Sequence, residues 1–253
     1  MRPEFRREQR LARRIVLVLA VLVVAIAGPL IFLPGLRLEI GQRLRLVPGE
    51  DAQRLYGPGA PVELVVLTQD VPVQFSAPYK RYTAVFIAEQ TGNGVVLHDL
   101  NHPRDVTVPL PTYDLIAASQ DRSRILFVDH SSAQPRAVLV TVATGAVDPL
   151  PPGHTRPDIP GDWGTDVGES AMDCDGVSPH DTYVACIRGP KGGTRFIFGN
   201  WELQVSRFGQ ANSDVLRLYR GRGSDPIAGW TTDESTIYLW NETGLWKVRV
   251  EKS

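Results

Sequence analysis

The sequence predicts an all-β domain of antiparallel β-hairpin repeats, preceded by one N-terminal transmembrane helix. Three features indicate this: an unbroken apolar run near the N-terminus, many short strand-like segments after it, and a turn-and-hairpin pattern that recurs in the second half. A chain of 253 residues suits one mid-sized domain with an appendage, or two small domains.

The apolar run is Ile15–Leu33, which contains no charged side chain. As a helix, 19 residues cover about 28 Å, close to the thickness of the hydrocarbon core of a bilayer. Six arginines and two glutamates lie in residues 1–14, and positive flanks stay in the cytoplasm. We therefore expect a single-pass protein of the cell membrane, with a cytoplasmic N-terminus and an extracytoplasmic C-terminal domain.

A cleaved signal peptide is the alternative, because Ala25-Ile26-Ala27 resembles a cleavage site. The apolar run resumes at Leu30–Leu33, which favours a retained anchor. Both alternatives place the main domain outside the cytoplasm.

The charge is distributed unevenly along the chain. Residues 1–14 carry +4, whereas the remaining 21 basic and 26 acidic residues leave −5. A mildly acidic domain has no electrostatic attraction for phosphate backbones, so nucleic-acid binding is excluded as a function.

The chain after the membrane begins with alternating apolar and charged residues over Leu36–Val47, the pattern of a strand. Prolines and glycines then predict a linker over Pro48–Pro61. The expected organisation is a cytoplasmic head (1–14), a transmembrane helix (15–33), a juxtamembrane strand and linker (34–61) and an extracytoplasmic domain (62–253).

Within this domain the apolar segments are short, rich in β-branched and aromatic residues, and bounded by turn-forming residues. The candidate strands are Val62–Thr68, Tyr82–Ala88, Val95–Leu100, Leu115–Ala118, Ile125–Asp129, Ala137–Val142, Thr182–Ile187, Arg195–Phe198, Trp201–Phe208, Val215–Tyr219, Ile237–Trp240 and Leu245–Val250.

Three of these strands follow a similar turn. The turns are Ser119-Gln120-Asp121, Ser178-Pro179-His180-Asp181 and Thr231-Thr232-Asp233. The hairpins that follow the first and the last end in or contain a Thr-Gly turn, at Thr144-Gly145 and Thr243-Gly244.

This pattern resembles the blades of TolB-like and WD-repeat β-propellers, in which an S-x-D turn opens a strand and a hairpin follows. The resemblance implies a propeller-like fold of three or four units, completed by blades within Leu36–Tyr79 or by a partner. The aspartates are 60 and 52 residues apart, more than a usual blade of about 40–50 residues. An irregular β-sandwich with similar hairpins is the alternative.

The only cysteines, Cys174 and Cys186, predict a structural disulfide in a compartment that permits one. Two buried thiols are the alternative. A bridge across so short a loop stabilises by about 3 kcal/mol.

Other chemistry has weaker signals. The acidic stretch Asp158–Asp175 lacks the spacing of a calcium loop, and the five histidines lack metal-ligand spacing. Gly176–His180 lacks the last glycine of a nucleophile elbow. We predict no catalytic, metal-binding or cofactor-binding residues.

Aromatic residues gather in the last hairpin: Trp230, Tyr238, Trp240 and Trp246. They form a candidate interaction surface, because Trp and Tyr dominate binding hot spots. The alternative is that they fill the core between blades.

The expected function is a non-enzymatic, membrane-anchored module for protein–protein interaction, serving as an accessory subunit of a larger membrane complex. One alternative is a ligand-binding or sensory ectodomain for a sugar, a peptide or Ca²⁺. Another is an extracytoplasmic hydrolase whose residues converge from separate loops.

Overall fold

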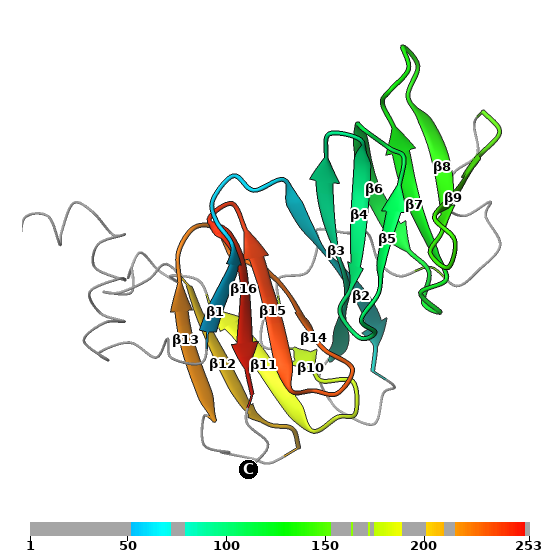
Figure 1. Cartoon of the computed structure of the whole chain (residues 1–253). Coiled ribbons are helices and arrows are strands. Elements are labelled where there is room, and N and C mark those ends of the chain that lie inside the picture. Colours follow the sequence, from blue (N-terminus) through cyan, green and yellow to red (C-terminus); the bar gives the residue numbers. More distant parts are fainter. Residues whose placement is uncertain are drawn as a thin grey trace, which may run out of the picture.

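The computed structural model describes residues 52–71, 79–152, 163, 172, 175–188, 201–209 and 216–250. These residues form an all-β protein of 16 strands in two open sheets (Figure 1). The predicted all-β class is confirmed.

The strands fall into four antiparallel units of four strands each. Unit 1 comprises β2 (Val62–Asp70), β3 (Lys80–Thr91), β4 (Gly94–Asp99) and β5 (Asp105–Val108). Unit 2 comprises β6 (Tyr113–Ala118), β7 (Arg124–Asp129), β8 (Arg136–Thr141) and β9 (Ala146–Pro149). Unit 3 comprises β10 (Gly176–Val177), β11 (Tyr183–Arg188), β12 (Trp201–Arg207) and β13 (Arg217–Gly221). Unit 4 comprises β14 (Ile227–Trp230), β15 (Thr236–Asn241), β16 (Gly244–Arg249) and β1 (Ala52–Tyr56).

The fourth strand of unit 4 comes from the other end of the chain. Strand β1 pairs antiparallel with β16, with Ala52 opposite Val248 and Tyr56 opposite Leu245. Residues 52–56 lie in the stretch for which the sequence predicted a linker. The first described strand therefore completes the last unit.

Strand β3 joins three units into one 12-stranded sheet. Along residues 80–89 it pairs with β2, and residues 86–91 pair with β4. Beyond the end of β4, Thr83 pairs in parallel with Trp230 of β14, and Lys80 pairs in parallel with Gly176 of β10. Because β2 occupies one edge of β3, strands β4, β14 and β10 share the other edge in succession.

Two hydrophobic clusters lie on opposite faces of the β2–β3 ribbon. Cluster 1 holds Leu64 and Val66 with the inward side chains of units 3 and 4. Cluster 2 holds Val65 and Leu67 with those of unit 2. Both faces are buried, which explains the near-continuous apolar sequence of β2. A bulge at Val85 shifts the alternation in β3, so that Val85 and Phe86 both join cluster 2.

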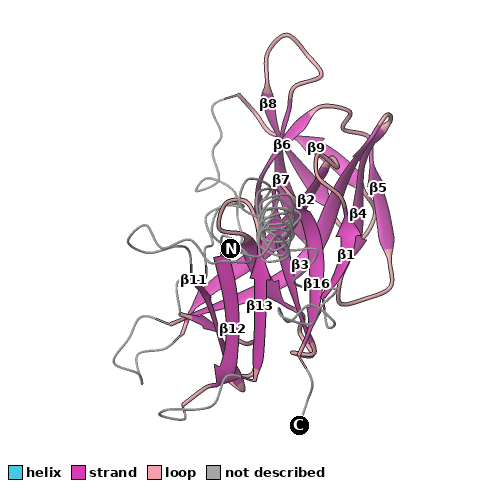
Figure 2. Ribbon diagram, turned by 90° about the vertical axis from the view of Figure 1, so that its left-hand side faces the viewer, coloured by secondary structure: helices cyan, strands magenta, loops and turns pink. Residues whose placement is uncertain are grey.

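Cluster 2 packs unit 2 on one face of unit 1, and cluster 1 packs units 3 and 4 on the other. Units 2 and 3 follow each other in sequence, yet they lie at opposite ends of the molecule in both Figure 1 and Figure 2. The described residues thus form an open stack of units with two end faces.

Candidate functional site: the turns and end faces of the stack

The first two strands of units 2, 3 and 4 are joined by turns of one design. The turns open with Ser119, Ser178 and Thr231, and the N–H of each donates to a carbonyl five residues later at 2.9 Å. The side-chain oxygen of each accepts the N–H of that same later residue, at 3.0, 2.9 and 3.2 Å respectively. A hydroxyl at this position therefore closes the turn, which explains the repeated Ser or Thr.

The fourth residue of each turn has a left-handed backbone. Arg122, Asp181 and Glu234 have φ of 61°, 58° and 59°. This region disfavours residues other than glycine, and it persists where surrounding contacts hold it.

The third residue of the turn is Asp121 in unit 2 and Asp233 in unit 4. Each carboxylate accepts from the opening hydroxyl at 2.6 Å and from a backbone N–H two residues on at 3.0 Å. In unit 3 this position is His180, and Asp181 takes the left-handed position instead. Aligning Asp181 with the other two aspartates, as the sequence spacing suggested, was therefore wrong: the opening residues are 59 and 53 apart.

All three turns contact unit 1 through side chains. In unit 2, Gln120 donates to the carbonyl of Thr68 at 3.2 Å and accepts from Gln69 at 2.7 Å. In unit 3, Asp181 accepts two bonds from Arg81 of β3, at 3.0 and 2.7 Å. Unit 1 is the common neighbour that holds the other three.

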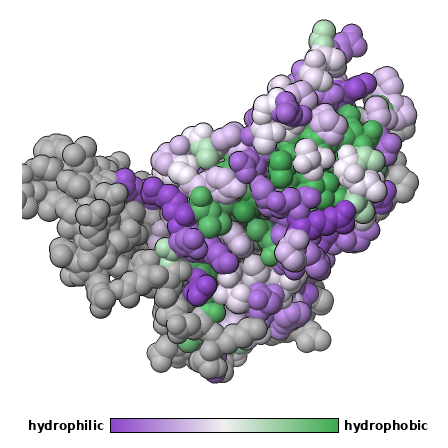
Figure 3. Space-filling view, in the orientation of Figure 1, coloured by the Kyte–Doolittle hydropathy of each residue, from purple (hydrophilic) through white to green (hydrophobic). Residues whose placement is uncertain are grey.

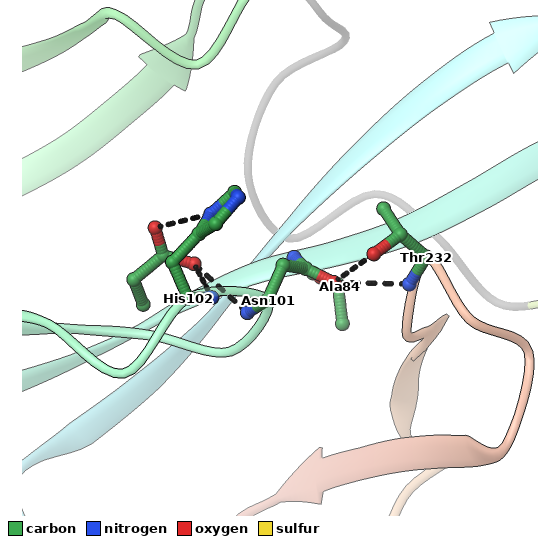
Figure 4. Close-up of polar contacts among 5 residues, drawn as sticks. Ala84, Asn101, His102 and Thr232 are labelled. Carbon is green, nitrogen blue, oxygen red and sulfur yellow. Dashed lines mark hydrogen bonds and ion pairs between the residues drawn. The ribbon is translucent and has the colours of Figure 1, made fainter.

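The contact with unit 4 runs through Asn101 (Figure 4). Its Oδ1 accepts the N–H and the hydroxyl of Thr232 at 2.9 and 2.7 Å, and its amide donates to the carbonyl of Ala84 at 3.1 Å. Asp99 fixes the loop by accepting the N–H groups of Asn101 and His102 at 2.8 and 3.0 Å.

Glu234 links the turns of units 3 and 4. It is buried, and its Oε1 accepts the N–H of His180 at 2.5 Å. Burial alone would raise the pKa of Glu234, but hydrogen bonds from Ser178, Thr182 and the His180 N–H outweigh it, so the pKa is lowered. The carboxylate is therefore held ionised inside the junction.

A series of hydrogen-bonded side chains connects the end of β1 to unit 1. The Tyr56 hydroxyl donates to Glu89 at 2.9 Å, and His98 lies between Glu89 at 3.0 Å and Asp105 at 2.9 Å. Burial, and then the neighbouring Glu89, raise the pKa of the Tyr56 phenol to about 12. No sequence spacing signals this series, because its members come from four different strands.

The aromatic residues of the last hairpin are mostly in the core. Trp230, Tyr238 and Trp246 are 0%, 6% and 6% exposed, whereas Trp240 is half-buried. The ring of Trp230 stacks on that of Tyr183, with centroids 5.8 Å apart. The ring of Trp246 meets that of Trp201 edge-on, with centroids 6.5 Å apart, so both tryptophans pack unit 4 against unit 3. Only Trp240 remains available for the predicted interaction surface.

Several predictions fall on residues that the structure does not describe. Cys186 is buried in β11, but Cys174 lies outside the described residues, so the disulfide stays a prediction. The expected transmembrane segment 15–33 also lies outside them. Within the described part of the chain, no helix is long and apolar enough to span a membrane. The same residues contain no group of three His, Cys, Asp or Glu side chains placed to bind a metal ion.

No protein-family model matches the chain, and no curated protein is detectably similar to it. Among solved structures, the chain is distantly similar to the crystal structure of TolB from Acinetobacter baumannii, at 13% identity and a TM-score of 0.23. The alignment covers 85% of this chain and 57% of TolB, so the chain spans little more than half the length of that protein.

Proposed function

We propose that the protein is a membrane-anchored, extracytoplasmic module whose four units act as propeller-like blades and bind a protein partner at the membrane. Three features support blades: four-stranded antiparallel units, a repeated turn between their first two strands, and face-to-face packing through hydrophobic clusters. The pairing of β1 with β16 completes unit 4 as a four-stranded unit from the two ends of the described chain.

The observation that carries the proposal is the open end of the stack at unit 2. Leu126, Val128 and Leu139 alternate with residues that enter cluster 2, so they lie on the opposite face of this sheet. Leu126 is buried there, and Val128 and Leu139 are half-buried. Figure 3 shows hydrophobic side chains gathered over the part of the molecule where β5 to β9 lie.

An apolar face of this kind is covered wherever two units meet inside the chain. Val65 and Leu67, on the face of unit 1 that meets unit 2, are 0% and 4% exposed. A partner that packs a sheet face on unit 2 would extend the same arrangement. Because residues 15–33 are expected to anchor the chain, such a partner is itself in or at the membrane.

Site-specific photo-crosslinking in native membranes tests the proposal. A photoreactive residue at Leu139, on the end face of unit 2, is expected to form an adduct with one membrane protein. The same probe at Gln53, exposed on β1, serves as the control and is expected to form none.

Two outcomes would contradict the proposal. One is the absence of an adduct from position 139, together with isolation of the full chain as a monomer without partners in mild detergent. The other is a reporter fused after Ser253 that faces the cytoplasm, which would contradict the topology.

A further inference from the structure

A small pocket lies where units 1, 2 and 4 meet. Its volume is about 220 Å³, and its wall includes Glu63 of β2, Gln90 of β3, Tyr113 of β6 and Trp240 of β15. Pockets for drug-sized ligands measure about 300–1,000 Å³. This pocket therefore suits a group the size of one amino-acid side chain or a small amine.

The carboxylate of Glu63 gives the pocket its charge. Glu63 is half-buried, and among the described residues no group forms a hydrogen bond or ion pair with its carboxylate. The residues that line the pocket include no lysine, arginine or histidine. A partly buried carboxylate without a cation is costly, and such uncompensated groups concentrate at functional sites.

A second carboxylate, that of Asp114, adds to this negative field. Asp114, on β6, already has a partner in His130, whose Nε2 lies 2.7 Å from Asp114 Oδ2. Burial first, and Asp114 second, raise the pKa of Glu63. A bound cation would oppose both effects.

Two aromatic rings complete the chemistry. Tyr113 is fixed edge-to-face against Phe127 at 5.3 Å and 89°, and Trp240 is the half-exposed tryptophan of the last hairpin. The faces of Tyr and Trp rings attract ammonium and guanidinium groups. The carboxylate of Glu63 and the two aromatic rings therefore both favour a cationic ligand.

We propose that this pocket binds an organic cation, an alkylammonium or a guanidinium group, held by the carboxylate of Glu63 and the rings of Tyr113 and Trp240. The cation is either a free amine or a lysine or arginine side chain of a peptide. This proposal is independent of the partner proposed above, because the pocket lies where units 1, 2 and 4 meet and not on the end face of unit 2.

The test is calorimetric titration of the full chain in detergent. The probes are n-butylammonium, n-butylguanidinium, the neutral n-butanol and a capped Gly-Arg-Gly peptide. Both cations are expected to bind, and n-butanol is expected to bind at least tenfold more weakly. Equal binding of n-butanol would overturn the proposal, because it would show a purely apolar site.

Variants separate the two contributions. Glu63→Gln keeps the shape of the side chain and is expected to weaken cation binding by about 10- to 100-fold, since hydrogen bonds to charged groups contribute about 1.5–3 kcal/mol. Trp240→Ala is expected to weaken it by roughly 2- to 5-fold, the range for a partly exposed cation–π contact. Asp148→Asn, an exposed carboxylate on β9, is the control.

The source of the cation follows from the same titrations. Peptide binding more than tenfold tighter than that of n-butylguanidinium indicates a basic side chain of a protein, and equal affinities indicate a small amine. Unchanged cation affinity in Glu63→Gln would refute the proposal, provided that the variant retains its melting temperature or exceeds it.

Discussion

Arg81 and Asp181, 100 residues apart, form a two-pronged ion pair between β3 and the turn of unit 3, with N–O distances of 3.0 and 2.7 Å. The pair is partly exposed, at 24% and 38% of the two side chains. It joins the unit that all repeated turns contact to the unit at one end of the stack. It therefore adds to the β10–β3 pairing in attaching unit 3 to unit 1.

We expect a double-mutant cycle between Arg81→Met and Asp181→Asn to give a coupling free energy of about 0.5–1 kcal/mol, as for partly exposed pairs. Asparagine tolerates the left-handed backbone at this position, so the variant changes the charge and not the turn. Urea unfolding followed by tryptophan fluorescence measures the cycle. A coupling of zero would show that solvent screening removes the interaction.

The hydroxyl that opens each repeated turn is expected to stabilise the fold. Thr231 is buried, and its hydroxyl contacts Asp233 at 2.6 Å and the backbone of Thr236 at 3.2 Å. Thr231→Val keeps the shape and removes both hydrogen bonds, so we expect a loss of about 1–2 kcal/mol in the free energy of unfolding. Thr107→Val, exposed on β5, is the control and is expected to change it by less than about 0.5 kcal/mol.

Gly221 and Gly92 form a matched pair of glycines. A methyl group at Gly221 would overlap the ring of Trp201, which is fully buried, whereas one at Gly92 meets nothing within 4 Å. We expect Gly221→Ala to lower the free energy of unfolding by about 3 kcal/mol, the upper end for overpacking. Gly92→Ala is expected to leave it nearly unchanged, and equal effects of the two substitutions would contradict the packing of unit 3 on Trp201.

Acid stability depends on the turn of unit 2. The Ser119 hydroxyl, followed by the N–H and hydroxyl of Ser123, lowers the pKa of Asp121 from 3.8 to about 2. A lowered folded pKa gives stabilisation that is complete above pH about 4 and is lost as the pH falls toward 2. Asp121→Asn should therefore melt at a lower temperature than the native chain at pH 6, and the difference should vanish near pH 2. A difference that persists at pH 2 would assign the effect to shape and not to charge.

The contribution of Glu63 to stability depends on pH in the opposite direction to that of Asp121. Burial, and then Asp114, raise the pKa of Glu63 above 4.5, so its ionised form destabilises the fold. This cost is present above the raised pKa and disappears as the pH falls below 4.5. Glu63→Gln should melt at a higher temperature than the native chain at pH 7.5, and the two should converge at pH 4. An unchanged melting temperature at pH 7.5 would show that the carboxylate is fully solvated.

Sequence patterns located most of the long strands and few of the short ones. Segments such as Ile125–Asp129 and Ala137–Val142 match β7 and β8 closely, because their apolar alternation reflects burial in cluster 2. The short strands β1, β5, β9, β10 and β14 were not predicted. Each has five residues or fewer, and three of them pair with strands far along the chain: β1 with β16, and β10 and β14 with β3.

The candidate site was predictable only in part. The hydroxyl and aspartate of the turns at Ser119 and Thr231 repeat in the sequence and were recognised. The pocket was not, because Glu63, Tyr113 and Trp240 come from three units that meet only in the folded chain. Three of the four aromatic residues singled out are core residues, since aromatic composition alone does not distinguish a surface from the contact between two sheets.

The pairing of β1 with β16 has a mechanical consequence for a tethered protein. Tension that enters the chain ahead of Ala52 reaches β16, the last strand in sequence, before it reaches β2, the next one. The hydrogen bonds between β1 and β16 carry that load first. The hydrogen bond from Tyr56 to Glu89, at the end of β1, carries it next. A pull from the membrane anchor that we propose would thus load the first and last strands before the hairpins between them.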